Sequence, residues 1–331
     1  MKIRLIAILC TMLYILCSAF PPLFAQIDED AGTTTAPFLR MGIGARAEGM
    51  GGAFVALSDD VNAVYWNPAG LSQLEKREIN LTYIQWFEGI KNHFVGFAYP
   101  LRKIHGAFGV NIVYLTVSGL DKMDNDGNRE GALSNYNGSF TVSYAQEVSP
   151  TLSLGGNLKI AGQKYDKYSG NAVALDGGLL WLPMDKVSFG ACFQNLGTKM
   201  DVGGGKAGLP FTLKGGVTVW LMERNLRISM ELDKPIASEI KTKLGAEFWM
   251  KEKVAFRAGY KMLSPRQKDY VFSGGIGFIA SYTPPKEEAW LGTGPSPKVA
   301  EVSQSKLTID YALASHGLFG LIHYVSFGIK F

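Results

Sequence analysis

Cysteine and long hydrophobic runs are both scarce in this sequence of 331 residues. Two of the three cysteines, Cys10 and Cys17, lie in the first 25 residues, and Cys192 alone cannot form an internal disulfide. Beyond residue 25, no apolar run approaches the roughly 20 residues that a helical membrane span needs. These absences exclude an internal disulfide and a helical inner-membrane protein.

Histidine and net charge are low as well. Four scattered histidines show no metal-ligand spacing with Cys192 or with one another: His93, His105, His316 and His323. His323 and Ser326 are three positions apart, so on a strand they would face opposite sides and could not act together as base and nucleophile. A net charge of +4 does not indicate a nucleic-acid surface. The sequence predicts no catalytic residue, metal site, cofactor or nucleic-acid partner, and it does not predict an enzyme.

The N-terminus has the order of charges and apolar residues that is typical of a secretory signal. Lys2 and Arg4 precede an apolar stretch from Leu5 to Phe20, and the small residue Ala25 follows, as expected of a signal-peptide cleavage site. A lipoprotein signal at Cys17 is disfavoured because large residues precede that cysteine. We therefore expect a signal peptide at residues 1–25, whose removal would leave the mature chain with a net charge of +2.

Fourteen runs of alternating polar and apolar residues follow from residue 78 onward, separated by breaks rich in Gly, Pro, Asp or Asn. The runs are 79–87, 93–99, 106–118, 137–147, 152–165, 172–182, 187–196, 211–221, 226–233, 242–249, 254–261, 271–280, 307–313 and 321–331. Period-two alternation is typical of β-strands with two different faces. In a membrane barrel the apolar face would turn to lipid, and the charged residues would line the lumen: Lys159, Lys214, Arg227, Glu231, Glu247 and Arg257.

The lengths of the connections favour a barrel over a soluble sandwich. Compact breaks at 100–103, 148–151, 183–186, 222–225 and 250–253 alternate with mostly wider ones, as in bacterial barrels with short periplasmic turns. The Pro-rich break 281–305 departs from this rule, and we expect it to be a periplasmic insertion. The predicted fold is all-β: a transmembrane antiparallel barrel of about 14 strands over residues 78–331.

The last strand carries a more specific sign. Val325, Phe327, Ile329 and the C-terminal Phe331 share one face of this strand. An aromatic-terminated strand of this type resembles the signal by which outer-membrane proteins insert through the barrel-assembly machinery. We expect these four residues to be the membrane-insertion signal.

Residues 26–77 do not alternate and instead form a compact segment rich in Gly and Ala. Gly49, Gly51 and Gly52 permit close backbone approach or positive φ. Asp59 and Asp60 are candidates to cap a short helix over 61–65, and Asn67-Pro68-Ala69-Gly70 follows it as a turn. A barrel of this size is too wide for strand side chains alone to fill, so we expect this segment to be a plug, or hatch.

This segment and the terminal strand resemble the FadL-type fatty-acid transporters and, more closely, the PorV/PorQ family of outer-membrane proteins. The FadL resemblance implies a hatch whose Asn67–Gly70 element lies near the barrel wall, where small shifts open a path. The PorV/PorQ resemblance implies a role in type IX secretion with exported proteins or periplasmic secretion components as partners.

Two other patterns in the sequence resemble functional motifs but lack the features that those motifs need. Gly42, Gly44 and Ala47 match the spacing of a dinucleotide fingerprint, but no hydrophobic strand precedes them, so the context that gives the motif meaning is absent. The acidic loop 121–130 resembles a calcium loop but fails the EF-hand pattern at Lys122 and Leu133.

Two functions remain open. The main prediction is a PorV/PorQ-type barrel of the cell outer membrane that binds protein partners in export or surface attachment. The alternative is a FadL-like transporter that passes long-chain fatty acids or other hydrophobic molecules through a hatch-gated lumen. A transporter requires an apolar pocket beside Asn67–Gly70, whereas a partner-binding barrel requires an exposed loop surface.

Overall fold

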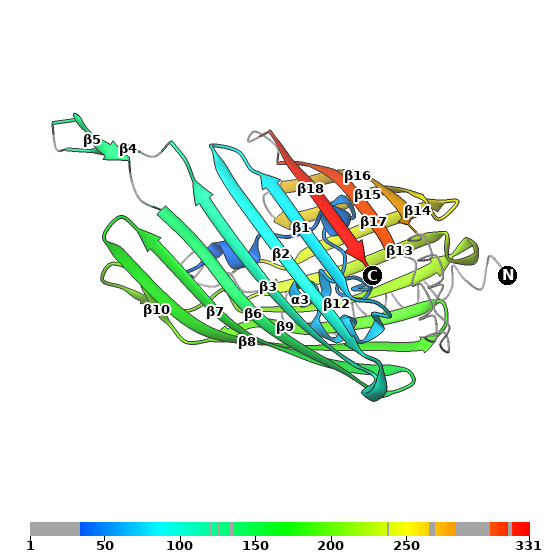
Figure 1. Cartoon of the computed structure of the whole chain (residues 1–331). Coiled ribbons are helices and arrows are strands. Elements are labelled where there is room, and N and C mark those ends of the chain that lie inside the picture. The colour runs from blue at the N-terminus through cyan, green and yellow to red at the C-terminus, as the bar shows by residue number, and fades with distance from the viewer. Residues whose placement is uncertain are drawn as a thin grey trace, which may run out of the picture.

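Within the residues that the computed structural model describes, fourteen antiparallel strands close into one barrel (Figure 1). These residues are 34–119, 121–124, 126–132, 135–236, 238–264, 269–282, 305–316 and 320–331. The barrel strands are β1 (Glu78–Gln85), β2 (Ile90–Leu101), β3 (Gly106–Val117), β6 (Asn135–Ser149), β7 (Leu152–Tyr165), β8 (Tyr168–Met184), β9 (Val187–Gly197), β12 (Thr212–Leu221), β13 (Leu226–Pro235), β14 (Lys241–Met250), β15 (Val254–Ser264), β16 (Asp269–Tyr282), β17 (Ser305–Ser315) and β18 (Leu321–Lys330).

The closing seam joins the first and last strands of the barrel. β1 pairs with β18 over eight residues, from Glu78 opposite Lys330 to Gln85 opposite His323. Figure 1 shows β18 in red beside β1 in cyan. Each of the fourteen predicted runs corresponds to one strand, so the fold prediction is confirmed. Two short hairpins were not predicted: β4 (Asp121–Met123) with β5 (Arg129–Ala132), and β10 (Met200–Asp201) with β11 (Lys206–Ala207).

The two faces of the wall have the polarity of a barrel in lipid. Large apolar side chains point outward, and Leu158, Phe256 and Phe327 remain 51%, 47% and 48% exposed. Polar and charged side chains of the same strands point inward and are buried, as at Lys159 and Glu247. A soluble protein rarely exposes apolar area on this scale, whereas a transmembrane barrel turns its apolar band outward.

The two ends of the barrel differ in their connections. At the short-turn end lie η3 (Arg102–Ile104), residues 150–151 and 185–186, η4 (Met222–Arg224), residues 251–253 and Phe331. Tyr282 pairs with Ser305 at this end, although the predicted insertion between them lies outside the described residues. The long-loop end carries both hairpins, and Figure 1 shows the β4–β5 hairpin projecting away from the barrel.

Residues 34–77 form an irregular segment inside the barrel, which we call the hatch. It contains η1 (Pro37–Arg40), α2 (Ala45–Gly49), α3 (Ala63–Trp66) and η2 (Pro68–Gln73). In Figure 1 this blue segment lies between the front and rear strands. None of the described helices is long and apolar enough to cross a membrane. The predicted signal peptide, residues 1–25, lies outside the described part of the chain.

Candidate functional site

The hatch crosses the lumen from one end of the barrel to the other. Thr35 N donates to Gly208 O (3.0 Å) in the loop between β9 and β12, at the long-loop end. The chain then reaches β1 at Glu78, at the short-turn end. The hatch therefore spans the length of the lumen.

Side chains of the barrel wall supply hydrogen-bond partners to the irregular hatch backbone. Glu231 of β13 is fully buried, and its Oε2 accepts from Phe54 N (2.8 Å) and Val55 N (2.7 Å). Asn157 of β7 donates through Nδ2 to Val64 O (2.9 Å). Because buried backbone groups without partners are costly, these inward polar residues stabilise a hatch that has little regular structure.

The predicted Asn67–Gly70 element contacts the wall at β7 and β8. Asn67 Nδ2 donates to Val55 O (2.8 Å) in the hatch and to Leu179 O (3.0 Å) on β8. Its Oδ1 accepts from Ala69 N (3.2 Å) and so caps η2. Asn67 is completely buried, and its one side chain joins hatch to wall.

Glycines of the wall allow this close approach. A Cβ added at Gly178 would lie 2.1 Å from Asn67 Oδ1 and 3.0 Å from Pro68 Cδ, and one at Gly155 would lie 2.4 Å from Ala69 N. These contacts show the Asn67–Ala69 backbone seated directly on two neighbouring strands.

The predicted hatch glycines also lie at tight contacts. Gly51 has a φ of +67°, and a Cβ there would come within 2.9 Å of Tyr260 N on β15. Gly52 has a φ of +72° and packs against Trp66. A Cβ at Gly49 would lie 3.4 Å from Arg257 Cβ, and one at Gly70 only 2.1 Å from Ser58 O.

On the side of β13 to β17, buried charges hold the hatch. Arg46 of α2 contacts Asp59 Oδ1 (2.6 Å) and Asp60 Oδ2 (2.9 Å) through Nη1, and Glu247 Oε1 on β14 (2.9 Å) through Nε. Glu247 is fully buried and also pairs with Arg257 of β15 (2.8 Å). Arg227 of β13 completes the set of cations around this carboxylate. We call Arg46, Asp59, Asp60, Arg227, Glu247, Arg257 and its partner Asp310 the charged latch.

The charged latch overturns one local prediction. Asp59 and Asp60 were expected to cap a helix over 61–65, but α3 begins at Ala63, and its N-cap Asn62 makes no side-chain cap bond. Burial raises the pKa of Asp59, but Arg46 and Arg227 outweigh it and hold that pKa below the ordinary value. The cap prediction was wrong because the helix begins later than expected: Asp59 pairs with Arg46, and Asp60 accepts from Asn62 N (2.9 Å) in the turn before the helix.

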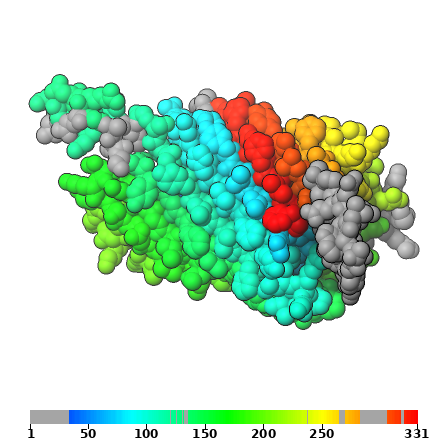
Figure 2. Space-filling model, in the orientation of Figure 1, coloured from blue at the N-terminus to red at the C-terminus, as the bar shows by residue number. Residues whose placement is uncertain are grey.

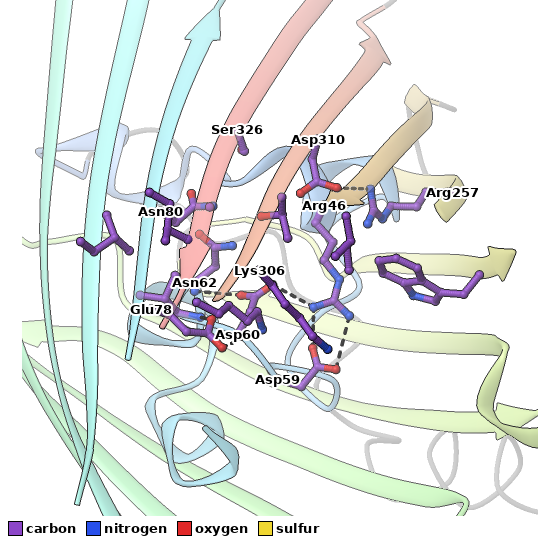
Figure 3. A pocket seen from close by; sticks show the side chains of 18 of the residues that line it. Arg46, Asp59, Asp60, Asn62, Glu78, Asn80, Arg257, Lys306, Asp310 and Ser326 are labelled. Carbon is purple, nitrogen blue, oxygen red and sulfur yellow. Dashed lines mark hydrogen bonds and ion pairs between the residues drawn. The ribbon is translucent and has the colours of Figure 1, made fainter. Parts of the chain in front are cut away.

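A polar cavity of about 190 Å³ lies between the charged latch and the short-turn end (Figure 3). Five cations and four carboxylates line it: Arg46, Arg227, Arg257, Lys306 and Lys330 against Asp59, Asp60, Glu78 and Asp310. In Figure 3 the Arg46 side chain reaches toward Asp59 across this space. The near balance of charge suits water and small polar solutes.

A second cavity, of about 240 Å³, lies on the opposite side of the hatch and faces the long-loop end. We call it the basic vestibule. It is lined by the cations Arg40, Lys214, Lys241, Lys243 and Lys261 and by only two carboxylates, Glu48 and Asp233. Four aromatic rings complete the wall: Tyr65, Trp66, Trp86 and Tyr324. Lys214 and Lys243 lie 4.9 Å and 5.2 Å from the Trp66 ring.

The remaining predicted features have these positions. Phe327, Ile329 and Phe331 point outward and are 48%, 44% and 39% exposed. In the acidic loop, Asp124 Oδ1 accepts from Asp126 N and Asn128 N, which closes the β4–β5 turn. Among the described residues, no cluster of His, Cys, Asp or Glu is placed to hold a metal ion. The sequence placed Lys214 in the lumen but did not indicate the basic vestibule, whose cations come from η1 and three strands, β12, β14 and β15.

Comparison with known proteins gives the same fold. A model of an uncharacterised protein family, UPF0164, matches residues 25–176. The toluene transporter TbuX of Ralstonia pickettii is similar over 87% of this chain and 97% of its own, with a TM-score of 0.58 and 14% identity. A FadL homologue of Pseudomonas aeruginosa is similar over 87% and 98%, with a TM-score of 0.56 and 11% identity.

The monoaromatic hydrocarbon channel CymD is similar over 88% of this chain and 98% of its own, with a TM-score of 0.57 and 14% identity. No curated protein matches the sequence. At such low identity the likeness establishes the fold, and the PorV/PorQ assignment stays a prediction. The chain therefore has the barrel fold of these solved structures.

Proposed function

We propose that this protein is a transporter of the cell outer membrane that takes up amphipathic molecules with an anionic head, of the long-chain fatty acid class. The observation that carries this proposal is the basic vestibule with its four aromatic rings. Lys243 and Lys261 pair with carboxylates there, but Arg40, Lys214 and Lys241 form no ion pair with a carboxylate of the described chain. A carboxylate head would pair with the cations, and the apolar tail would lie against the rings. A neutral hydrocarbon would gain nothing from the charges.

The hatch gives this transporter its gate. A ligand in the basic vestibule lies against Glu48 and Trp66 of the hatch, and the polar cavity lies beyond Arg46. Passage to the short-turn end requires the hatch to shift. Movement at the charged latch, with Asn67–Gly70 held at the wall, would join the two cavities.

Titration of the full-length barrel in detergent with oleate tests this proposal. Lys241 and Arg40 line the vestibule, and no carboxylate of the described chain pairs with either. The double variant Arg40→Gln/Lys241→Gln should bind oleate about 10-fold more weakly, a loss of about 1.4 kcal/mol. The matched control is Lys253→Gln, on an exposed turn at the other end, and it should bind as the wild type does.

Oleate methyl ester separates charge from apolar contact. The ester should bind the wild type more weakly than oleate, and the double variant should not change its affinity. Equal affinity of oleate for the wild type and the double variant would contradict an anionic substrate. Equal binding of oleate and its ester to the wild type would do the same.

Partner binding in protein export, the PorV/PorQ-type function, is the second candidate. The observation in its favour is the β4–β5 hairpin, which projects from the barrel and exposes Met123 by 57% (Figure 1). If the protein binds partners in export, polypeptides should co-purify with the full-length protein, and deletion of residues 121–132 should abolish this co-purification. If the protein is a transporter, the same deletion should leave oleate binding unchanged.

A further inference from the structure

A third cavity lies outside the lumen, at the membrane edge of the short-turn end. It has a volume of about 590 Å³ and is lined by residues 75–77, 99–104 and Phe331. These residues come from the hatch exit, from the end of β2 with the η3 turn, and from the C-terminus. We call this region the C-terminal corner. In Figure 2 the C-terminal end of β18, in red, lies at the outer surface beside the cyan strands.

Aromatic and apolar side chains of the C-terminal corner face outward. Tyr99, Ile104 and Phe331 are 38%, 51% and 39% exposed, and Tyr99 belongs to the apolar outer face of β2. Aromatic residues at the end of an outward face are typical of the boundary between the hydrocarbon core and the lipid head groups. The corner therefore lies at head-group level.

Positive charge is concentrated at this corner. Four cations line the cavity, Lys76, Arg77, Arg102 and Lys103, against the Glu75 carboxylate and the chain's own C-terminal carboxylate. The other charged turns at this end have fewer cations: Asp185–Lys186 and Glu223–Arg224 each carry one acid and one base, and 251–253 carries two bases and one acid. An anionic head group would find its complement at the corner rather than at these turns.

The side chains of Arg77 and Arg102 are held in place by contacts that do not neutralise their charge. The guanidinium of Arg77 lies over the Tyr99 ring, 4.8 Å from its centroid. Arg102 donates through Nε and Nη2 to the backbone carbonyl of Glu75 (3.2 Å and 2.6 Å), which fixes the guanidinium without a counter-charge. Neither arginine pairs with a carboxylate in the described part of the chain. Two fixed guanidinium groups are well suited to a phosphodiester.

We propose that the C-terminal corner binds an anionic phospholipid, with the phosphate at Arg77 and Arg102 and an acyl chain along Tyr99 and Phe331. The proposal rests on the membrane placement of the barrel and is independent of any transport activity. A bound lipid would fill the cavity between the hatch exit and the last strand. It would thereby anchor the seam where β1 meets β18.

Native mass spectrometry of the full-length protein tests the site. The protein is released from detergent containing equal amounts of phosphatidylglycerol and phosphatidylcholine. The wild type should retain phosphatidylglycerol about five-fold or more over phosphatidylcholine. Arg77→Gln/Arg102→Gln should lose this preference, whereas the matched control Arg224→Gln/Lys253→Gln, at other turns of the same end, should keep it.

Three results would overturn the proposal: no lipid preference in the wild type, a preference that survives in Arg77→Gln/Arg102→Gln, or displacement of the lipid by inorganic phosphate. The last result would identify a site for free anions. Heat-modifiable migration in gels verifies that each variant is folded. If the glutamine variant does not fold, the wild-type competition decides alone, and Arg77→Lys/Arg102→Lys should keep part of the preference.

Discussion

The hatch is held in two different ways on opposite sides of the lumen. On the side of β13 to β17, the charged latch joins it to the wall through Arg46 and Glu247. On the side of β7 and β8, the backbone of Asn67–Ala69 is seated on Gly155 and Gly178, with one amide side chain bonded across. Wall glycines seat the hatch backbone on both sides, because Gly245 and Gly259 meet Met50 and Gly51 on β14 and β15. The difference is the charged latch, which joins hatch and wall by ion pairs on the side of β13 to β17.

This difference indicates which side can move. Ion pairs can exchange their partners for water or for other charges, and the cavity beside the latch is polar. On the side of β7 and β8, amide hydrogen bonds and close packing join the hatch to the wall, and packed backbone moves only by opening a void. We therefore expect Asn67–Gly70 to act as the pivot and the charged latch as the releasing side.

The largest expected effect is at the centre of the latch. Glu247→Gln leaves Arg46, Arg227 and Arg257 buried with a reduced counter-charge, and breaking a buried pair in this way costs about 3–5 kcal/mol. Urea unfolding in detergent measures the loss. The exposed Glu223→Gln is the control and should change stability by less than about 0.5 kcal/mol. Equal stability of Glu247→Gln and the wild type would show that the latch does not hold the hatch.

The pivot side should respond to one added methyl group. Gly178→Ala places a Cβ 2.1 Å from Asn67 Oδ1, and overpacking of this kind costs about 1–3 kcal/mol. Gly215→Ala is the matched control, because a Cβ on that wall glycine meets nothing within 4 Å. Identical unfolding curves for the two variants would contradict the packing of the hatch on β8.

Removing the amide at the pivot should have a smaller effect. Asn67→Ala loses the bonds to Val55 O and Leu179 O and the cap of η2, at a cost of about 1–2 kcal/mol. Limited proteolysis of the hatch should become faster in this variant. A rate equal to that of the wild type would place the pivot elsewhere.

The smallest expected effect is a pH dependence at the latch. The pKa of Asp59 is lowered in the folded protein, so its stabilisation is present above the ordinary value of 3.8 and is lost as the pH falls through the lowered value. Asp59→Asn should therefore flatten the fall in stability below about pH 4. Acid unfolding followed by tryptophan fluorescence measures both slopes, and equal slopes would remove Asp59 from the latch.

Most of the fold could be predicted from the sequence because a lipid-facing barrel has a local signature. The alternation of polar and apolar residues predicted all fourteen barrel strands, and it correctly placed Lys159 and Glu247 on the inner face of the wall. The hairpins β4–β5 and β10–β11 are too short to show alternation, and they lie inside predicted loops.

The site was less predictable because its contacts join residues far apart in sequence. Arg46 and Glu247 are 201 positions apart, and no local pattern pairs them. The sequence singled out Asn67–Gly70, but it could not show which wall glycines this element meets. Asp59 and Asp60 looked like helix caps because their pairing with Arg46 depends on the tertiary fold. The boundaries at residues 25 and 77 and the insertion signal stay predictions.

The central claim is that the hatch closes the lumen and is released at the charged latch. Conductance measurements in planar bilayers test this claim most directly. The full-length wild type should remain closed most of the time. Arg46→Gln, which leaves Asp59, Asp60 and Glu247 without their shared cation, should open in discrete steps. A wild type that conducts continuously, or an Arg46→Gln variant as closed as the wild type, would contradict the account.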